Sequence, residues 1–206
     1  YYASFAGLLC VGPVQTLHAI LADDEVAWEG PINAGTNDFA EITVEGRGAL
    51  TLYWGTATQG LDADLAASGV DHPAYRGQCY AVFNDWLLGE NRAQVPSLAF
   101  DLSRIPAIDW LTSSASLNGE ANPVAALAEL LTDARFGAGI PTDALDTEGW
   151  NAVAAQLASE GFSLSVFLDQ ASRLDAVLND FLEYLDAALC HTTDGKLSLR
   201  LLRESV

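Results

Sequence analysis

The sequence predicts an α+β protein in which a strand-rich, barrel-like N-terminal domain is followed by a mainly helical domain with a C-terminal β-hairpin. Two observations lead to this fold class. Apolar residues alternate with polar ones through much of the first part of the chain, and after Asn122 they recur about every 3.6 residues instead. Between the two patterns, residues 111–121 are small and polar without a sustained period, which indicates a linker. We therefore expect domains at residues 1–110 and 122–206.

Two hairpins are predicted in the N-terminal domain. The first joins the apolar runs 14–21 and 26–30 through acidic residues 23–25. We interpret these acids as a hairpin tip, because they lack the ligand spacing and the glycine of a calcium loop. The second hairpin turns at residues 46–48, where two glycines allow the positive φ angles of a tight reversal. No Gly-Lys-Ser/Thr sequence follows, so this turn is not a phosphate loop.

Residues 72–106 contain two unlike strands. The apolar side chains of the first strand divide between its two faces, with Cys79, Ala81 and Phe83 on one face and Tyr80, Val82 and Trp86 on the other. Because neither face is polar, we expect this strand to be covered on both sides. In the second strand, residues 98–103, apolar and polar side chains alternate, so one face is expected to meet water.

Three helices are predicted in the second domain. The first is capped by Asn122 and ends near Asp133, and the second is capped by Thr147 and ends at Gly161. The third covers residues 171–189. A turn that contains glycine then leads into a final strand. We expect residues outside this chain to complete the sheet of that strand.

The chain carries a net charge of −19, with a single lysine and scattered arginines. Because no basic stripe is present to neutralise phosphates, stable nucleic-acid binding is not expected. The acids either keep the protein soluble or repel DNA that passes along a conduit, and the sequence leaves both explanations open. No apolar run approaches the roughly 20 residues that span a bilayer, so we expect no membrane insertion by this chain.

The cysteines and histidines indicate no metal site or disulfide framework. Cys10, Cys79 and Cys190 are far apart in the sequence, and an odd number argues against a set of disulfides. We expect each to be a free thiol in apolar surroundings. Only Cys190 and His191 bring two ligand types together, and neighbouring residues of a strand point to opposite faces. The sequence therefore predicts no metal ligand.

No catalytic constellation is present in the sequence. It lacks the motifs of serine hydrolases and zinc proteases, and its carboxylates are too numerous to single out a catalytic pair. The glycine-rich loop at residues 135–146 could cradle a ligand, but we favour a compact crossover held to the core by Phe136 and Ile140. We expect no enzymatic activity, and we assign no catalytic, cofactor-binding or metal-binding residue.

Several short strings occur in an ordered series along the chain. The first group is PAYRG at 73–77, NDWLL at 84–88, NR at 91–92 and VPS at 95–97. The second group is NP at 122–123, LLTD at 130–133 and RFGAGIP at 135–141. An opening pair is YASFA at 2–6 and CVGPV at 10–14. In these strings the chain resembles the N-terminal hub region of phage tail tip proteins, the baseplate hub family that includes the lambda-like tip attachment protein.

The resemblance implies a virion structural protein of the tail tip, made in the bacterial host cytoplasm, without a cofactor. Such a central hub joins the tail tube to the distal tip or fibres and forms part of the conduit for DNA ejection during host attachment. It implies a homotrimer that contacts other tail proteins, and DNA that passes only transiently. Because the chain contains no methionine, we expect it to be a piece of a longer phage or prophage protein.

Two other functions remain open from the sequence. One is a receptor- or carbohydrate-binding module of a tail, which an exposed group of Trp28, Trp54 and Trp110 would favour. The other is a cell-wall hydrolase domain, which would need a cleft with two carboxylates. For a hub assembled from acidic chains, we also expect three arginines to lie close to acidic neighbours. These are Arg76, Arg92 and Arg104.

Overall fold

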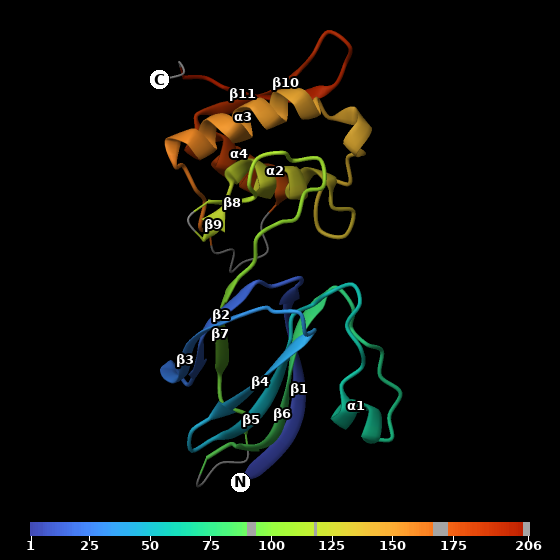
Figure 1. Cartoon of the computed structure of the whole chain (residues 1–206), viewed down its shortest axis with the longest axis vertical. Coiled ribbons are helices and arrows are strands. Elements are labelled where there is room, and N and C mark those ends of the chain that lie inside the picture. Colours follow the sequence, from blue (N-terminus) through green and yellow to red (C-terminus); the bar gives the residue numbers. More distant parts are fainter. Residues whose placement is uncertain (90–93, 118, 167–172, 204–206) are drawn as a thin grey trace. The chain divides into compact units, whose positions relative to one another are not determined.

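The computed structural model describes residues 1–89, 94–117, 119–166 and 173–203 (Figure 1). These residues form an α+β protein with eleven strands in several sheets and four α-helices. The chain divides into two compact units, Tyr1–Arg104 and Ile105–Val206. The short strands β8 (Ser116–Leu117) and β9 (Glu120–Ala121) lie within the segment that the sequence indicated as a linker, and they belong to the second unit.

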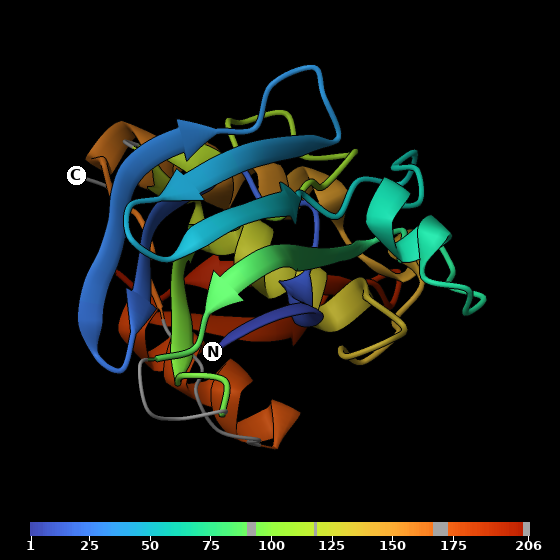
Figure 2. The same cartoon turned by 90° about the horizontal axis from the view of Figure 1, so that it is seen from below.

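The first unit consists of two antiparallel sheets. The larger sheet has the order β1 (Tyr2–Val11), β6 (Gln78–Leu87), β5 (Gly48–Tyr53) and β4 (Phe39–Val44). The smaller sheet has the order β3 (Glu25–Asn33), β2 (Thr16–Ala22) and β7 (Leu98–Ser103). Figure 2 shows the larger sheet as a row that starts with the dark blue β1 beside the light green β6.

The two sheets share one buried core but do not close into the predicted barrel. Ile20 of β2, Leu52 of β5 and Phe83 of β6 belong to the same apolar cluster, and each is almost fully buried. Among the described strands, each sheet is an open row with two edges. The alternating pattern specifies one buried face per strand, but it does not specify whether the outer strands of two facing sheets pair.

Both predicted hairpins are confirmed. Asp23 and Asp24 join β2 to β3 with φ angles of 52° and 67°, the left-handed conformation that a two-residue hairpin turn needs. The second hairpin joins β4 to β5, and Gly46 in its turn has a φ of 72°. In each case polar or glycine residues between two apolar runs were sufficient to predict the hairpin.

Strand β6 is buried on both faces, as the sequence predicted. Cys79, Ala81 and Phe83 face the core between the sheets. On the other face, Tyr80 packs with Leu65 and Tyr75. These two residues come from the segment between β5 and β6, which includes the short helix α1 (Ala63–Ala67) beside the sheet in Figure 1. The cover of the second face therefore comes from this chain.

The predicted side of Trp86 is wrong. Trp86 lies in the same buried cluster as Phe83, not on the face of Tyr80. Asp85 has a φ of 47°, and the pairing of β1 with β6 shifts register between Ala3 and Phe5. This bulge adds one residue to β6 and returns Trp86 to the core.

The second unit contains three α-helices and a C-terminal hairpin, in the order α2 (Pro123–Thr132), α3 (Thr147–Glu160), α4 (Leu174–Leu185), β10 (Ala187–His191) and β11 (Leu197–Leu201). A short 3-10 turn, Thr142–Ala144, precedes α3. Leu127 of α2, Trp150 of α3, Phe181 of α4 and Leu199 of β11 meet in one apolar cluster. No helix in the described part of the chain is long and apolar enough to cross a membrane.

The helix ends were predicted with mixed success. Asn122 caps α2 by accepting the N–H of Val124 at 3.0 Å, and Gly161 ends α3 in the left-handed conformation, as expected. The cap of α3 is Asp146, not Thr147, because the Asp146 carboxylate accepts the N–H of Gly149.

The third helix is shorter than its leucine spacing indicated. Asp186 ends α4 with a φ of 50°, and the following residues pair with β11, where Leu189 lies opposite Leu199. The leucine period continues past the end of the helix, but pairing with β11 determines the structure there. The expected residues 171–172 of this helix lie outside the described part.

Candidate functional site

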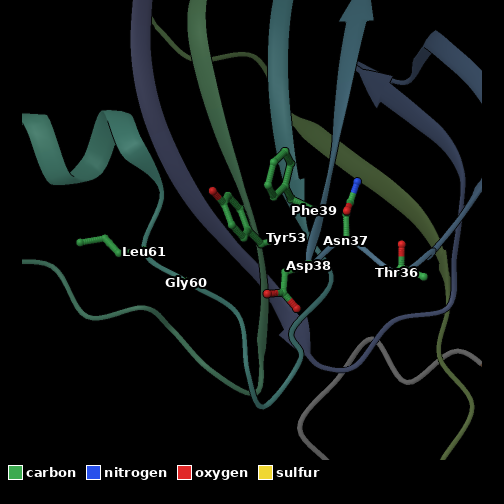
Figure 3. A pocket seen from close by; sticks show the side chains of 7 residues that line it. All are labelled: Thr36, Asn37, Asp38, Phe39, Tyr53, Gly60 and Leu61. Atoms are coloured by element: carbon green, nitrogen blue, oxygen red, sulfur yellow. The ribbon is translucent and has the colours of Figure 1, made fainter.

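The first unit has an open pocket of about 360 Å³ on the outer side of the larger sheet (Figure 3). Its lining comes from the loop before β4, from the facing ends of β4 and β5, and from the segment before α1. The lining residues are Thr36, Asn37, Asp38, Phe39, Tyr53, Gly60 and Leu61.

Strand register places the two aromatic rings of the pocket. Phe39 is the register partner of Tyr53, and their ring centroids are 5.4 Å apart. Tyr53 also stacks on Tyr80 of β6, with a centroid distance of 4.5 Å and an interplanar angle of 3°. The aromatic wall of the pocket is therefore continuous with the buried outer face of β6.

The hydroxyl of Tyr53 is fixed as a hydrogen-bond donor. It donates to Oδ2 of Asp62 at 3.1 Å. Burial raises the pKa of Tyr53, and the negative charge of Asp62 raises this pKa further. Asp62 in turn caps α1, because its Oδ1 accepts the N–H groups of Asp64 and Leu65. This network holds α1 against the sheet next to the pocket.

Gln59 holds the wall of the pocket that contains Gly60 and Leu61. Its side chain is fully buried, and its Oε1 accepts the N–H of Gly55 at 2.9 Å. Its Nε2 lies within hydrogen-bond distance of three carbonyl oxygens, at 3.2, 2.7 and 3.1 Å from those of Ala74, Tyr75 and Gln78. One amide thus connects the end of β5 with the start of β6, and we call this arrangement the Gln59 clamp.

The acidic side of the pocket is also held by its neighbours. Oδ1 of Asp38 accepts the hydroxyl of Thr56 at 2.7 Å, and the carbonyl of Asp38 accepts the N–H of Trp54 at 3.0 Å. Phe39 and Leu61 remain 39% and 37% exposed. The lining combines the carboxylate of Asp38 with hydroxyl, amide and partly exposed apolar groups, which together offer contacts to a partly apolar ligand.

The tryptophans do not form the exposed group that a carbohydrate-binding surface would need. Trp54 is buried in the core between the two sheets. Trp28 is partly buried against the same core. Trp110 belongs to the second unit, where it packs edge-on against Trp150 at a centroid distance of 6.3 Å.

Two of the three arginines that we expected near acids can be placed. Arg76 is exposed, and its Nε donates to the carbonyl oxygen of Gln59 at 3.2 Å. Arg104 is partly buried, and its positive charge acts on the thiol of Cys10. Arg92 lies outside the described residues.

The glycine-rich loop between α2 and α3 packs onto α2, consistent with a crossover. The N–H of Ala138 donates to the carbonyl of Leu130, and that of Ile140 donates to the carbonyl of Leu131. A Cβ on Gly137 would clash with the carbonyl oxygen of Leu130, so glycine is required there for close approach. Ile140 packs against the core, whereas Phe136 is an exposed large apolar residue and does not hold the loop as predicted.

All three cysteines are free thiols. Cys10 and Cys79 are register partners on β1 and β6, and their thiols hydrogen-bond to each other. Within the described residues, no three metal-binding side chains gather in one place. Neither the pocket nor the cysteine pair was predicted, because both arise from pairing between strands that are distant in sequence.

The comparisons with known proteins add no assignment to this site. No protein-family model matches the chain, and no curated protein matches it.

Proposed function

We propose that this chain is a structural subunit of a phage tail tip, where it forms part of the central hub between the tail tube and the distal tip or fibres. The observation that carries the proposal is that strand β1 is an edge of its sheet without charged residues. β1 is ten residues long, and within the described part of the first unit it pairs with β6 alone. It contains no charged side chain, and its residues Tyr2 and Leu8 are 69% and 61% exposed.

The other three sheet edges of this unit carry features that discourage the addition of a strand. β3 has Glu25, Glu29 and Pro31, β4 has Glu41, and β7 has Asp101. Charged side chains and proline on an edge strand protect it from pairing with another chain. β1 has neither, which supports a role for this edge in assembly with a neighbouring chain.

The charge distribution also supports assembly through the N-terminal region. A chain with a net charge of −19 is repelled by its own copies, and this repulsion is weakest at an uncharged surface. Residues 1–22 contain no aspartate, glutamate, lysine or arginine. In a hub of three copies joined through such surfaces, the remaining acids would repel DNA from the wall of the conduit.

The strings that resemble tail tip proteins have architectural roles in the fold. In the first group, the carbonyl of Tyr75 accepts from Gln59, and both Tyr75 and Gly77 have positive φ angles in the turn before β6. In the second group, Asp133 and Arg135 form an ion pair at 2.8 Å where α2 ends. These roles suit a scaffold protein.

Multi-angle light scattering of the chain over a range of concentrations tests this proposal. We expect self-association up to a trimer, and we expect Ala6→Lys, on the exposed side of β1, to reduce it. Thr43→Lys is the matched control, because Thr43 is exposed on β4, an edge that already carries an acid. A mass that stays that of one chain at all concentrations, or equal effects of both variants, would contradict assembly through β1.

The pocket favours a second function, a receptor- or carbohydrate-binding module of the same kind of tail. Its exposed Phe39 offers an aromatic ring for stacking, and Thr36 and Asn37 offer polar groups beside it. A glycan array, followed by titration of any hit into the Phe39→Ala variant, tests this alternative. Binding that is lost in Phe39→Ala would favour it over a purely structural role.

A further inference from the structure

The pairing of β1 with β6 brings two cysteines together across the ladder. Cys10 and Cys79 are direct register partners, and both side chains belong to the core side of the larger sheet. Directly opposed residues of an antiparallel pair have Cα atoms about 4.5 to 5.5 Å apart, which lies inside the range of about 4.4 to 6.8 Å found in disulfides. The backbone therefore already brings these residues within bonding reach.

The two thiols differ in a way that suits stepwise oxidation. Cys79 is fully buried, whereas Cys10 is partly exposed at the edge of the sheet. The hydrogen bond with Cys79 lowers the pKa of Cys10, and the charge of Arg104 lowers this pKa further. The same hydrogen bond raises the pKa of Cys79, and burial raises it further. Cys10 is thus the more accessible and the more readily ionised thiol, and Cys79 is the protected thiol next to it.

The ladder beside the pair is irregular on one side and firm on the other. Its register shifts between Leu8 and Cys10, so the short stretch of β1 that leads to Cys10 is not held in a regular ladder. Beyond the pair, the N–H of Gly12 donates to the carbonyl of Gly77 at 2.9 Å. The Cys10 sulfur can therefore adjust toward Cys79 while Val11 stays paired with Gln78 and Gly12 keeps its hydrogen bond to Gly77.

We propose that Cys10 and Cys79 are a redox-active pair that forms an intramolecular disulfide with a small disulfide oxidant such as glutathione disulfide. The Cys10 thiolate attacks one sulfur of the oxidant, forms a mixed disulfide and releases one glutathione thiolate. The Cys79 thiol then loses its proton and attacks the Cys10 sulfur, which releases the second glutathione thiolate. Two protein thiols are oxidised, one glutathione disulfide is reduced to two thiols, and the protons from the cysteines go to the released thiolates.

The bond would tie the long edge strand β1 to the central strand β6. It would close a loop that contains β2 to β5, and restriction of so long a loop in the unfolded chain raises stability. This inference does not depend on the proposed function, because it uses only the two strands and their thiols.

The test uses the full chain, incubated with glutathione disulfide or with dithiothreitol and then analysed by free-thiol titration and peptide mass mapping. The reduced protein has three thiols, and we expect oxidation to leave one, on Cys190. The peptides of Cys10 and Cys79 should be linked, and the Tm should rise by several degrees. Three titratable thiols after equilibration, or a link that contains Cys190, would overturn the proposal.

Two variants separate the roles of the thiols. Cys79→Ala keeps the accessible thiol, so we expect a stable glutathione adduct on Cys10 at the level of one per chain. Cys190→Ser should form the internal link at the rate of the wild type. If Cys79→Ala does not fold, the order of attack is read from the wild type by rapid alkylation, and early adducts on Cys79 instead of Cys10 would contradict it.

Discussion

Replacement of Gln59 by leucine tests whether the Gln59 clamp holds the outer layer of the first unit. The side chain is fully buried, accepts one hydrogen bond from Gly55 and donates its two amide protons among three backbone carbonyls. Gln59→Leu has a similar shape but removes these bonds and leaves the backbone partners without them. At about 1 kcal/mol per hydrogen bond, with the added cost of buried unpaired groups, we expect a loss of about 3 to 5 kcal/mol in the free energy of unfolding.

Urea unfolding and hydrogen exchange measured by mass spectrometry provide the readouts. The variant should unfold at lower urea, and the amides of residues 54–78 should exchange faster than those of the second unit. Gln156→Leu is the matched control, since Gln156 lies on α3 and its amide donates to Glu160 one turn along the helix at an exposed position. We expect a change below about 0.5 kcal/mol for this variant. A loss below about 1 kcal/mol in Gln59→Leu, with unchanged exchange in residues 54–78, would refute the clamp.

Three further predictions concern the second unit. The hydrogen bond from Arg135 lowers the pKa of Asp133 to about 2. The stabilisation that this carboxylate contributes is therefore present above its usual pKa of about 4 and is lost as the pH falls toward 2. Asp133→Asn should cost about 1 kcal/mol near pH 6 after solvent screening, and equal costs at pH 6 and pH 2 in urea unfolding would contradict this. Gly137→Ala should lower the Tm by several degrees, because the new Cβ would meet the backbone of α2. Gly35→Ala is the control and should leave the Tm unchanged, because the space around its new Cβ is open. Calorimetry compares the two variants. Trp150→Phe removes a buried N–H that donates to a carbonyl of β11 at 3.0 Å. We expect this substitution to cost about 2 kcal/mol in urea unfolding. A cost below about 0.5 kcal/mol would show that the hydrogen bond is not needed.

The features that the sequence predicted correctly depend on neighbouring residues. Asn122 followed by Pro123 specifies a helix start, because one side chain supplies the cap and the next residue lacks an N–H to satisfy. The hairpin at Asp23 and Asp24 is similarly local. The two-sided burial of β6 was also predicted, since its apolar residues occupy both faces of one strand.

The features that the sequence did not predict depend on contacts between distant segments. The bulge at Asp85 requires β1 as a partner, and the end of α4 at Asp186 depends on the pairing of β10 with β11. The pocket follows from the register that sets Phe39 opposite Tyr53 and from the fold of the segment around Gln59. None of these has a signal within a short stretch of sequence.

Electron microscopy of tailed particles labelled with an antibody against this chain tests the central claim most directly. If the chain is a hub subunit, the label should lie at the distal end of the tail, and averaged images without label should show a threefold ring at that position. Label on the capsid or along the length of the tail would contradict the proposed function. Recovery of the protein only in fractions without particles would contradict it as well.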